Sequence, residues 1–315
     1  MAVIRGCGVK RLALGLGVVA AAGAAIGFWL TAPTPVNAAR LERIAELEGD
    51  AAAGETMFWA GGCASCHAAP GAKDEARLLL SGGVRLQSDF GTFIAPNISP
   101  DPEAGIGGWT ISDFANAMLA GVSPNGRHYY PAFPYGSYTR MSDGDIADLF
   151  AFMQTLPESD VASLPHEVGF PFNIRRSLGG WKLLFFTDEP RVTLAGGDPQ
   201  LQRGQYLVEG PGHCGECHTP RNLIGGFVSN AWLSGAENPE GEGVIPNLTP
   251  GGKSIGSWSA SDISYYLESG FTPDFDSVGG SMVEVQANMA QLESGDRDAI
   301  AAYLKALPER ANGWE

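Results

Sequence analysis

Two copies of the motif Cys-x-x-Cys-His, at residues 63–67 and 214–218, constrain this chain more than any other feature. Two residues between the thiols let both reach one porphyrin edge, and the next side chain then points at the metal. The motif therefore predicts covalent haem rather than a zinc or thiol-redox pair beside a chance histidine. We expect two haem c groups, with thioethers from Cys63, Cys66, Cys214 and Cys217 and axial imidazoles from His67 and His218.

The N-terminus carries a signal for export. Three basic residues precede an uncharged run over residues 12–30, which Pro33 and Pro35 then break. Residues 36–38 offer a small-residue cleavage site, but nineteen uncharged residues also suffice to span a bilayer. We expect residues 1–39 to be an export signal or, in preference, an uncleaved anchor with its basic end in the cytoplasm. Cys7 is interpreted as a cytoplasm-facing residue without a role.

The exported part of the chain is strongly acidic. The whole chain has a net charge of −15, and removal of the three basic residues in the export segment leaves −18. Such a surface disfavours nucleic acid and favours a basic redox partner. No Walker sequence, Gly-rich nucleotide loop or flavin fingerprint is present in the sequence, so we expect a partner protein to oxidise any organic substrate.

The chain repeats itself at an offset of about 150 residues. Besides the two haem motifs, the segments at residues 96–100 and 246–250 match, and both halves close with an apolar helical pattern that ends in Leu-Pro. Each half is predicted to hold three or more helices joined by loops rich in glycine and proline. We expect domains at residues 40–158 and 199–315, separated by a linker at 159–198. The linker includes a short apolar helix, near residues 175–186, that either packs on the two domains or docks a partner subunit.

These features bring the chain close to a known family. Each half resembles a class I cytochrome c domain, and residues 50–310 resemble the diheme cytochrome c subunits of membrane-bound alcohol, gluconate and sorbitol-type dehydrogenases. Residues 90–100 and 126–135 carry this likeness. The resemblance implies an all-α fold made of two tandem class I domains behind an N-terminal hydrophobic helix. It also implies that Trp109 and Trp258 bind the haem propionates, with core packing as the alternative.

The family's sixth iron ligand is a methionine in the loop before the last helix of each domain. In the second half we expect Met282, with Met289 as its rival. In the first half the family's Pro-Ala-Met-Pro is replaced by a sequence with Phe133, which cannot ligate iron. We expect Met141 there, with His128 as the competitor and Met118 as a core residue. A Met ligand raises the reduction potential relative to a second His.

We therefore predict a periplasmic electron-transfer protein, anchored in the inner membrane or soluble after cleavage. It would carry electrons from a dehydrogenase to a terminal oxidase or small cytochrome. The alternative is a catalytic diheme enzyme, such as a peroxidase with one open iron. A thiosulfate dehydrogenase is disfavoured because no cysteine remains after Cys7 to serve as a ligand. A role in anchoring a dehydrogenase is compatible with electron transfer. We expect His213 to be solvated or to support a ligand, and we assign no partner to His166.

Overall fold

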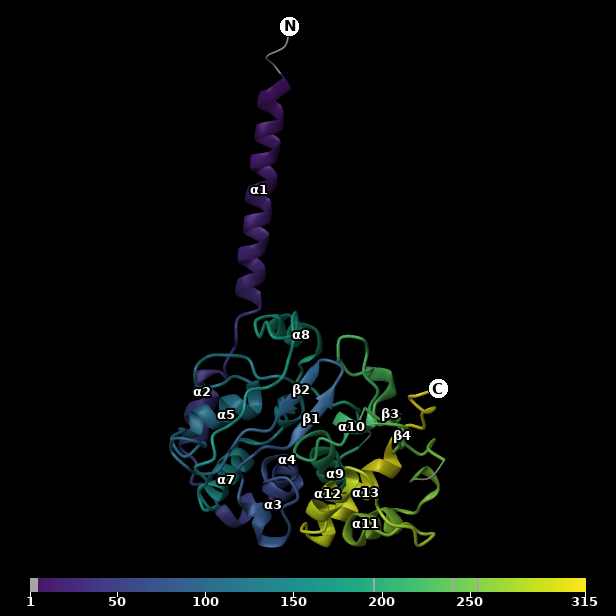
Figure 1. Cartoon of the computed structure of the whole chain (residues 1–315). Coiled ribbons are helices and arrows are strands. Elements are labelled where there is room, and N and C mark those ends of the chain that lie inside the picture. Colours follow the sequence, from purple (N-terminus) through teal and green to yellow (C-terminus); the bar gives the residue numbers. More distant parts are fainter. Residues whose placement is uncertain (1–4, 195, 240, 254) are drawn as a thin grey trace.

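The computed structural model describes residues 5–194, 196–239, 241–253 and 255–315, without side-chain detail for residues 5–12. A single long helix, α1 (Arg5–Leu30), stands away from a globular remainder (Figure 1). Residues 13–30 of α1 are long and apolar enough to cross a membrane, by length and composition, and are not buried in the protein. The predicted apolar helix is therefore present. The side chain of Cys7 lies outside the part that the structure describes.

Residues 40–158, which we call the first unit, and residues 199–315, the second unit, lie side by side (Figure 1). The helices before and within the first unit are α2 (Ala38–Ala45), α3 (Ala51–Ala60), α4 (Cys63–His67), α5 (Ile111–Ala120), α6 (Tyr135–Tyr138) and α7 (Asp143–Met153). The second unit contains α9 (Pro199–Glu209), α10 (Gly215–His218), α11 (Ala260–Ser269), α12 (Met282–Met289) and α13 (Ser294–Ala306). Between them lies α8 (Ser177–Phe185), within the segment where the sequence predicts a short apolar helix.

Helices dominate, but the all-α expectation needs one correction. Two antiparallel hairpins are present, β1 (Arg85–Ser88) with β2 (Gly91–Ile94) and β3 (Ala236–Glu237) with β4 (Val244–Ile245). The strands have at most four residues, and the two buried residues of β2, Phe93 and Ile94, are consecutive, so the strands lack the alternating pattern by which a strand is recognised in a sequence. Both hairpins lie in the loop that follows a haem motif.

Each unit is held together by a close crossing of its first and last long helices. A Cβ atom on Gly54 of α3 would lie 2.0 Å from the carbonyl oxygen of Asp148 in α7. A Cβ atom on Gly204 of α9 would lie 1.9 Å from the carbonyl oxygen of Ala299 in α13. Only glycine permits such contact between two backbones. The crossing fixes the direction in which α3 and α9 lead into the haem motifs.

The middle helices α5 and α11 begin and end in the same way. Thr110 and Ser259 are N-caps whose hydroxyls accept hydrogen bonds from the backbone N–H of Asp113 and Asp262, and these carboxylates accept bonds from the caps in return. Such capping boxes satisfy N–H groups that have no partner within the helix. Both helices end at a left-handed glycine. The sequence pattern predicts these helices from about residue 112 to 120 and from about residue 259 to 268, and the observed bounds agree to within one residue.

Candidate haem sites

In the first unit, α3 leads directly into the haem motif. Gly62 adopts a left-handed conformation (φ +59°) and starts α4, which contains the whole motif. His67 ends this helix, and its Nδ1 donates a hydrogen bond to the carbonyl oxygen of Pro96 at 2.8 Å. A proton held on Nδ1 leaves the lone pair of Nε2 for a metal. Desolvation lowers the pKa of His67, which favours the neutral, ligating form.

The second motif repeats this arrangement. His213, the residue before Cys214, also has a positive φ of +37°, in the place of Gly62. His218 is buried, and its Nδ1 donates to the carbonyl oxygen of Pro246 at 2.7 Å. Desolvation again lowers the pKa of this imidazole. Each predicted axial histidine is thus oriented by a proline carbonyl located 28 or 29 residues further along the chain.

The thiols of both motifs fit thioether formation. Burial, followed by the neighbouring Cys66, raises the pKa of Cys63 to about 12. Burial and the neighbouring Cys217 raise the pKa of Cys214 to about 12 as well. Protonated thiols in apolar surroundings are not poised for metal binding as thiolates. Among the described residues, no group of three or more His, Cys, Asp or Glu side chains could hold a metal ion, so the Nδ1-anchored histidines beside paired cysteines fit a covalently attached haem better than a zinc site.

The segment after each axial histidine is fixed by matching hydrogen bonds. Asn97 Oδ1 accepts a bond from the N–H of Ser99 at 2.9 Å, and Asn247 Oδ1 accepts one from the N–H of Thr249 at 2.8 Å. Both amides donate to the chain that follows the last helix of their unit, at Ser159 and Arg310. These buried asparagines hold the proline carbonyls in place. The matching sequence segments therefore have a shared structural purpose.

Trp109 and Trp258 occupy equivalent places just before the capped helices α5 and α11. Both are half-buried, and their backbone N–H groups donate to Ile106 and Ile255. Trp258 packs against Tyr266 with ring centroids 5.3 Å apart. The backbones of the two tryptophans are thus held alike, at equivalent positions of the repeat.

In the first unit, the two candidates for sixth ligand lie in different surroundings. Met141 precedes α7, is only 2% exposed and belongs to the hydrophobic core. His128 is also buried, but its Nε2 lies 3.0 Å from the carbonyl oxygen of Thr31, at the end of α1. Met118 is a core residue, as expected. The structure therefore connects His128 with the end of α1 rather than with the motif.

Phe133 is half-buried against Tyr138, with ring centroids 5.7 Å apart. The Tyr138 hydroxyl donates to the carbonyl oxygen of Gly61 at 3.0 Å, next to the first motif. Burial raises the pKa of Tyr138 well above its usual value, so the phenol is neutral. Aromatic side chains thus line the loop in which the family has a methionine.

In the second unit, Met282 and Met289 stand at opposite ends of α12. Met282 is the first residue and half-buried, whereas Met289 is the last and is 5% exposed within the core. Helix α12 contacts both α3 and α4 of the first unit. The loop expected to supply a ligand to one haem therefore lies against the attachment motif of the other.

Two reciprocal hydrogen bonds join the units at the motifs. Asn288 Nδ2 in α12 donates to the hydroxyl of Ser65 in the first motif at 2.6 Å. The Ser137 hydroxyl in α6 donates to the carboxylate of Glu216 in the second motif at 3.0 Å. Asn288 and Ser137 are 151 residues apart, and so are Glu216 and Ser65. Equivalent positions thus contact each other in both directions, which is the mark of a two-fold related interface.

His213 adds a third contact across this interface, which we call the motif interface (Ser65, Ser137, His213, Glu216 and Asn288). Its Nε2 lies 3.1 Å from the carbonyl oxygen of Gly61. Its ring packs against the ring of Tyr138 in a T-shaped arrangement, with centroids 5.7 Å apart. Sequence reasoning expected a solvated or supporting residue and did not identify this partner. It also missed His166, whose Nδ1 accepts a hydrogen bond from the N–H of Ile94 at 3.1 Å.

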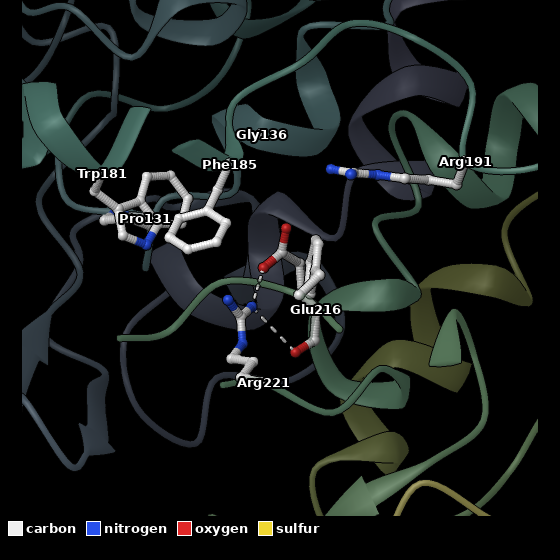
Figure 2. Close-up of a pocket in the computed structure, with 8 residues that line it drawn as sticks. Pro131, Gly136, Trp181, Phe185, Arg191, Glu216 and Arg221 are labelled. Carbon is white, nitrogen blue, oxygen red and sulfur yellow. Dashed lines mark hydrogen bonds and ion pairs between the residues drawn. The ribbon is translucent and has the colours of Figure 1, made fainter. Parts of the chain in front are cut away.

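A small pocket adjoins the motif interface (Figure 2). Glu216 forms an ion pair with Arg221 at its floor, and Trp181 and Phe185 of α8 face this pair. Pro131 and Gly136 of the first unit, together with Arg191 and Phe227, complete the lining. The linker helix α8 therefore packs where the two units meet. Packing on the two domains was one of the two roles expected for it, and docking of a partner subunit was the other.

Comparison with known proteins agrees with this geometry. Residues 51–157 match the cytochrome c family. A diheme c-type cytochrome of Cereibacter sphaeroides is 56% identical over 300 residues, which span 95% of this chain and 98% of that protein. The chain is therefore a c-type cytochrome. More closely, it belongs to the diheme c-type cytochromes, which carry two covalently bound haem c groups.

Several dehydrogenase subunits are also similar. The cytochrome c subunit of the quinone alcohol dehydrogenase of Gluconobacter oxydans is 37% identical over 82% of this chain and 55% of that protein. The cytochrome subunit of fructose dehydrogenase from Gluconobacter japonicus is 34% identical over 90% of this chain and 56% of that protein. The chain thus spans about half the length of these subunits. The resemblance expected from the sequence is confirmed.

Proposed function

We propose that the protein is an electron carrier made of two tandem cytochrome c domains, the first and second units, each holding one haem. His67 and His218 would ligate the two irons through Nε2, and the four motif cysteines would form the thioethers. Bound in this way, haem supplies a one-electron iron couple. The observation that carries the proposal is the repeated Nδ1 hydrogen bond to Pro96 and Pro246, which orients both imidazoles alike.

For the sixth positions we propose Met141 and Met282. The bond between His128 and Thr31 supports Met141, because it commits the Nε2 of His128 away from the first motif. Met282 is supported over Met289 by its position shortly after Gly279 and Gly280, where a Cβ atom would meet nothing within 4 Å and the backbone can approach a haem closely. Ligation by methionine at both irons would leave no open coordination site, which favours transfer over catalysis.

We further propose a direction for the electrons. The relatives that are cytochrome subunits of alcohol, fructose and gluconate dehydrogenases suggest a dehydrogenase as donor. A terminal oxidase or a small cytochrome would accept the electrons. The motif interface supports passage within the molecule, because side chains from both attachment motifs are one hydrogen bond from the opposite unit. The acidic surface would steer basic partners toward the protein.

We propose that α1 is retained as an anchor that holds the globular part on the periplasmic side of the inner membrane. The N–H of Val36 donates to Asn116 Oδ1 at 2.9 Å, and Asn37 is the N-cap of α2. Arg40 forms an ion pair with Asp143 at 2.6 Å. Cleavage near residue 38 would remove the first two of these contacts, so the segment after α1 is built into the fold.

The test is EPR spectroscopy of the purified ferric protein, together with optical spectra of the reduced protein before and after addition of CO. Two low-spin signals and no reaction with CO are expected. A high-spin signal with CO binding at one haem would contradict the proposal and favour a catalytic diheme enzyme. Spectra of Met141→Ala and His128→Ala variants would show which of the two residues ligates the iron of the first unit.

A further inference from the structure

A cluster of exposed apolar side chains lies near the end of the membrane helix. Leu183 and Leu184 of α8 are 62% and 69% exposed, and Leu223 is 99% exposed. Phe170 is 81% exposed and Ile224 is 54% exposed. A water-soluble surface rarely gathers side chains of this size without a partner.

Contacts between the segments that carry these residues join them into one surface. The indole N–H of Trp181 in α8 donates to the carbonyl oxygen of Ile224 at 3.1 Å. The ring of Phe90 packs against Phe172 with centroids 5.0 Å apart and lies beside Gly225. Helix α8, the segment at residues 170–174 and the turn at residues 223–225 are therefore neighbours. We call this the apolar surface (Phe170, Phe172, Leu183, Leu184, Leu223 and Ile224).

This surface is fixed against the end of α1. A Cβ atom on Gly179 of α8 would lie 2.1 Å from the carbonyl oxygen of Thr31, the residue that follows α1. Arg176 donates from Nε to the Thr31 hydroxyl at 3.2 Å, and its guanidinium lies 4.0 Å from the ring centroid of Phe28. Helix α8 lies at the end of the globular part from which α1 projects (Figure 1).

The charge of this region opposes that of the rest of the exported chain. Residues 168–187 contain Arg175 and Arg176 and no acidic residue, whereas the chain as a whole carries a charge of −15. The third basic residue, Lys182, donates to the carbonyl oxygens of Ala120 and Gly121 and is not counted toward this surface. Apolar side chains mixed with basic ones are typical of protein surfaces that enter the headgroup region of an anionic bilayer.

We propose that the apolar surface is immersed in the outer boundary of the membrane that α1 spans. If residues 13–30 cross the bilayer, Thr31 lies at its edge, and α8, which packs on Thr31, must lie there too. Contact of the apolar surface with lipid would fix the orientation of the globular part relative to the bilayer. Helices α11 and α13 would then face away from the lipid. This inference rests on the proposed retention of α1.

The experiment uses the full-length protein with one copy in each nanodisc of phosphatidylethanolamine and phosphatidylglycerol. Single cysteines replace Leu184, Leu223, Val19 in α1 and, as a control, Tyr265, which is 55% exposed in α11 at the opposite end of the globular part (Figure 1). Cys7→Ser is included because Cys7 would also react. A water-soluble maleimide is added, and its attachment is followed by mass spectrometry.

We expect positions 184 and 223 to react at least about tenfold more slowly than position 265, because lipid excludes the reagent. Equal rates at 184, 223 and 265, with position 19 protected, would overturn the apolar surface while leaving the anchor intact. Reaction at position 19 would instead refute the anchor. Protection that appears only with two copies per nanodisc, or only with an added dehydrogenase, would assign the surface to protein and overturn the inference.

Discussion

The two units build the same site on different side chains. In the helix before the first motif, Trp59 is buried with its indole donating to Glu55. At the equivalent place in the second unit stands Glu209, which is 1% exposed. Its carboxylate accepts bonds from the N–H of Arg191 at 2.6 Å, from Gln205 at 3.0 Å and from the Tyr303 hydroxyl. A large aromatic in one unit is thus replaced by a fully hydrogen-bonded carboxylate in the other.

This difference shows which parts of the site tolerate divergence. The bonds that orient His67 and His218 use proline carbonyls of the backbone, and they are retained in both units. The buried neighbours of the motifs vary in size and charge. Because charges near an iron shift the relative stability of its two oxidation states, we infer that the units hold similar haems at different potentials.

Removal of the attachment cysteines should have the largest effect. We expect Cys63→Ala/Cys66→Ala and Cys214→Ala/Cys217→Ala each to reduce the haem content from two to one, because the two motifs bind independently. Intact mass and the haem-to-protein ratio report the result. Retention of two haems in either double variant would show that the motif is not the attachment site.

Substitution of a proposed methionine ligand should change the coordination and the reduction potential of one iron and leave the other iron unchanged. Met282→Ala should open the iron of the second unit to CO and lower its potential, since loss of thioether ligation favours ferric iron. Met289→Leu is the matched control and should leave both spectra unchanged. If Met289→Leu opened the iron and Met282→Ala did not, the assignment within α12 would be reversed.

The glycine crossings should be equally sensitive in the two units. We expect Gly54→Ala and Gly204→Ala each to lower the free energy of unfolding by about 1–3 kcal/mol or more, because the new methyl group meets a backbone carbonyl. Gly295→Ala in α13 meets no atom within 4 Å and should stabilise by up to about 1 kcal/mol through helix propensity. Denaturant titration measures all three. Equal effects at positions 204 and 295 would argue against the close crossing.

Substitutions at the two equivalent positions of the motif interface, Asn288 and Ser137, should lower the free energy of unfolding by different amounts. Asn288→Ala leaves both Ser65 and the buried Arg77 without their shared partner, for a cost of about 1–3 kcal/mol. Ser137→Ala leaves Glu216 paired with Arg221, so we expect about 0.5–1.5 kcal/mol. Thermal unfolding tests the order. A larger loss in the Ser137 variant would contradict it.

The smallest expected effect concerns Glu209. Glu209→Gln keeps the shape of the side chain but removes its negative charge. Because that negative charge stabilises ferric iron in the second unit, its loss favours the ferrous state. We expect the potential of that haem alone to rise by an amount on the order of tens of millivolts, for a charge separated by protein of intermediate dielectric. Potentiometric titration resolves the two haems. Trp59→Phe is the control at the equivalent position and should not shift the potential of the second haem.

The sequence alone indicated much of this molecule because its strongest signals are local. Short windows of the sequence contain the two motifs, the capped helices after Trp109 and Trp258, and the apolar run before Pro33. The repeat is recognised because such windows match at an offset of about 150 residues. Attachment chemistry, capping and membrane crossing depend on nearest neighbours in the chain, so they can be recognised without a fold.

Only the tertiary structure decided which distant residues meet. The carbonyl oxygens of Pro96 and Pro246 accept hydrogen bonds from histidines 29 and 28 residues earlier in the chain. Asn288 bonds to Ser65 across 223 residues, and α8 packs on Thr31 at the end of α1. These pairings follow from how helices pack around a buried core, where a shape match between remote segments determines the partner. A polar side chain in the sequence shows that a hydrogen bond is required, but the fold determines which atom satisfies it.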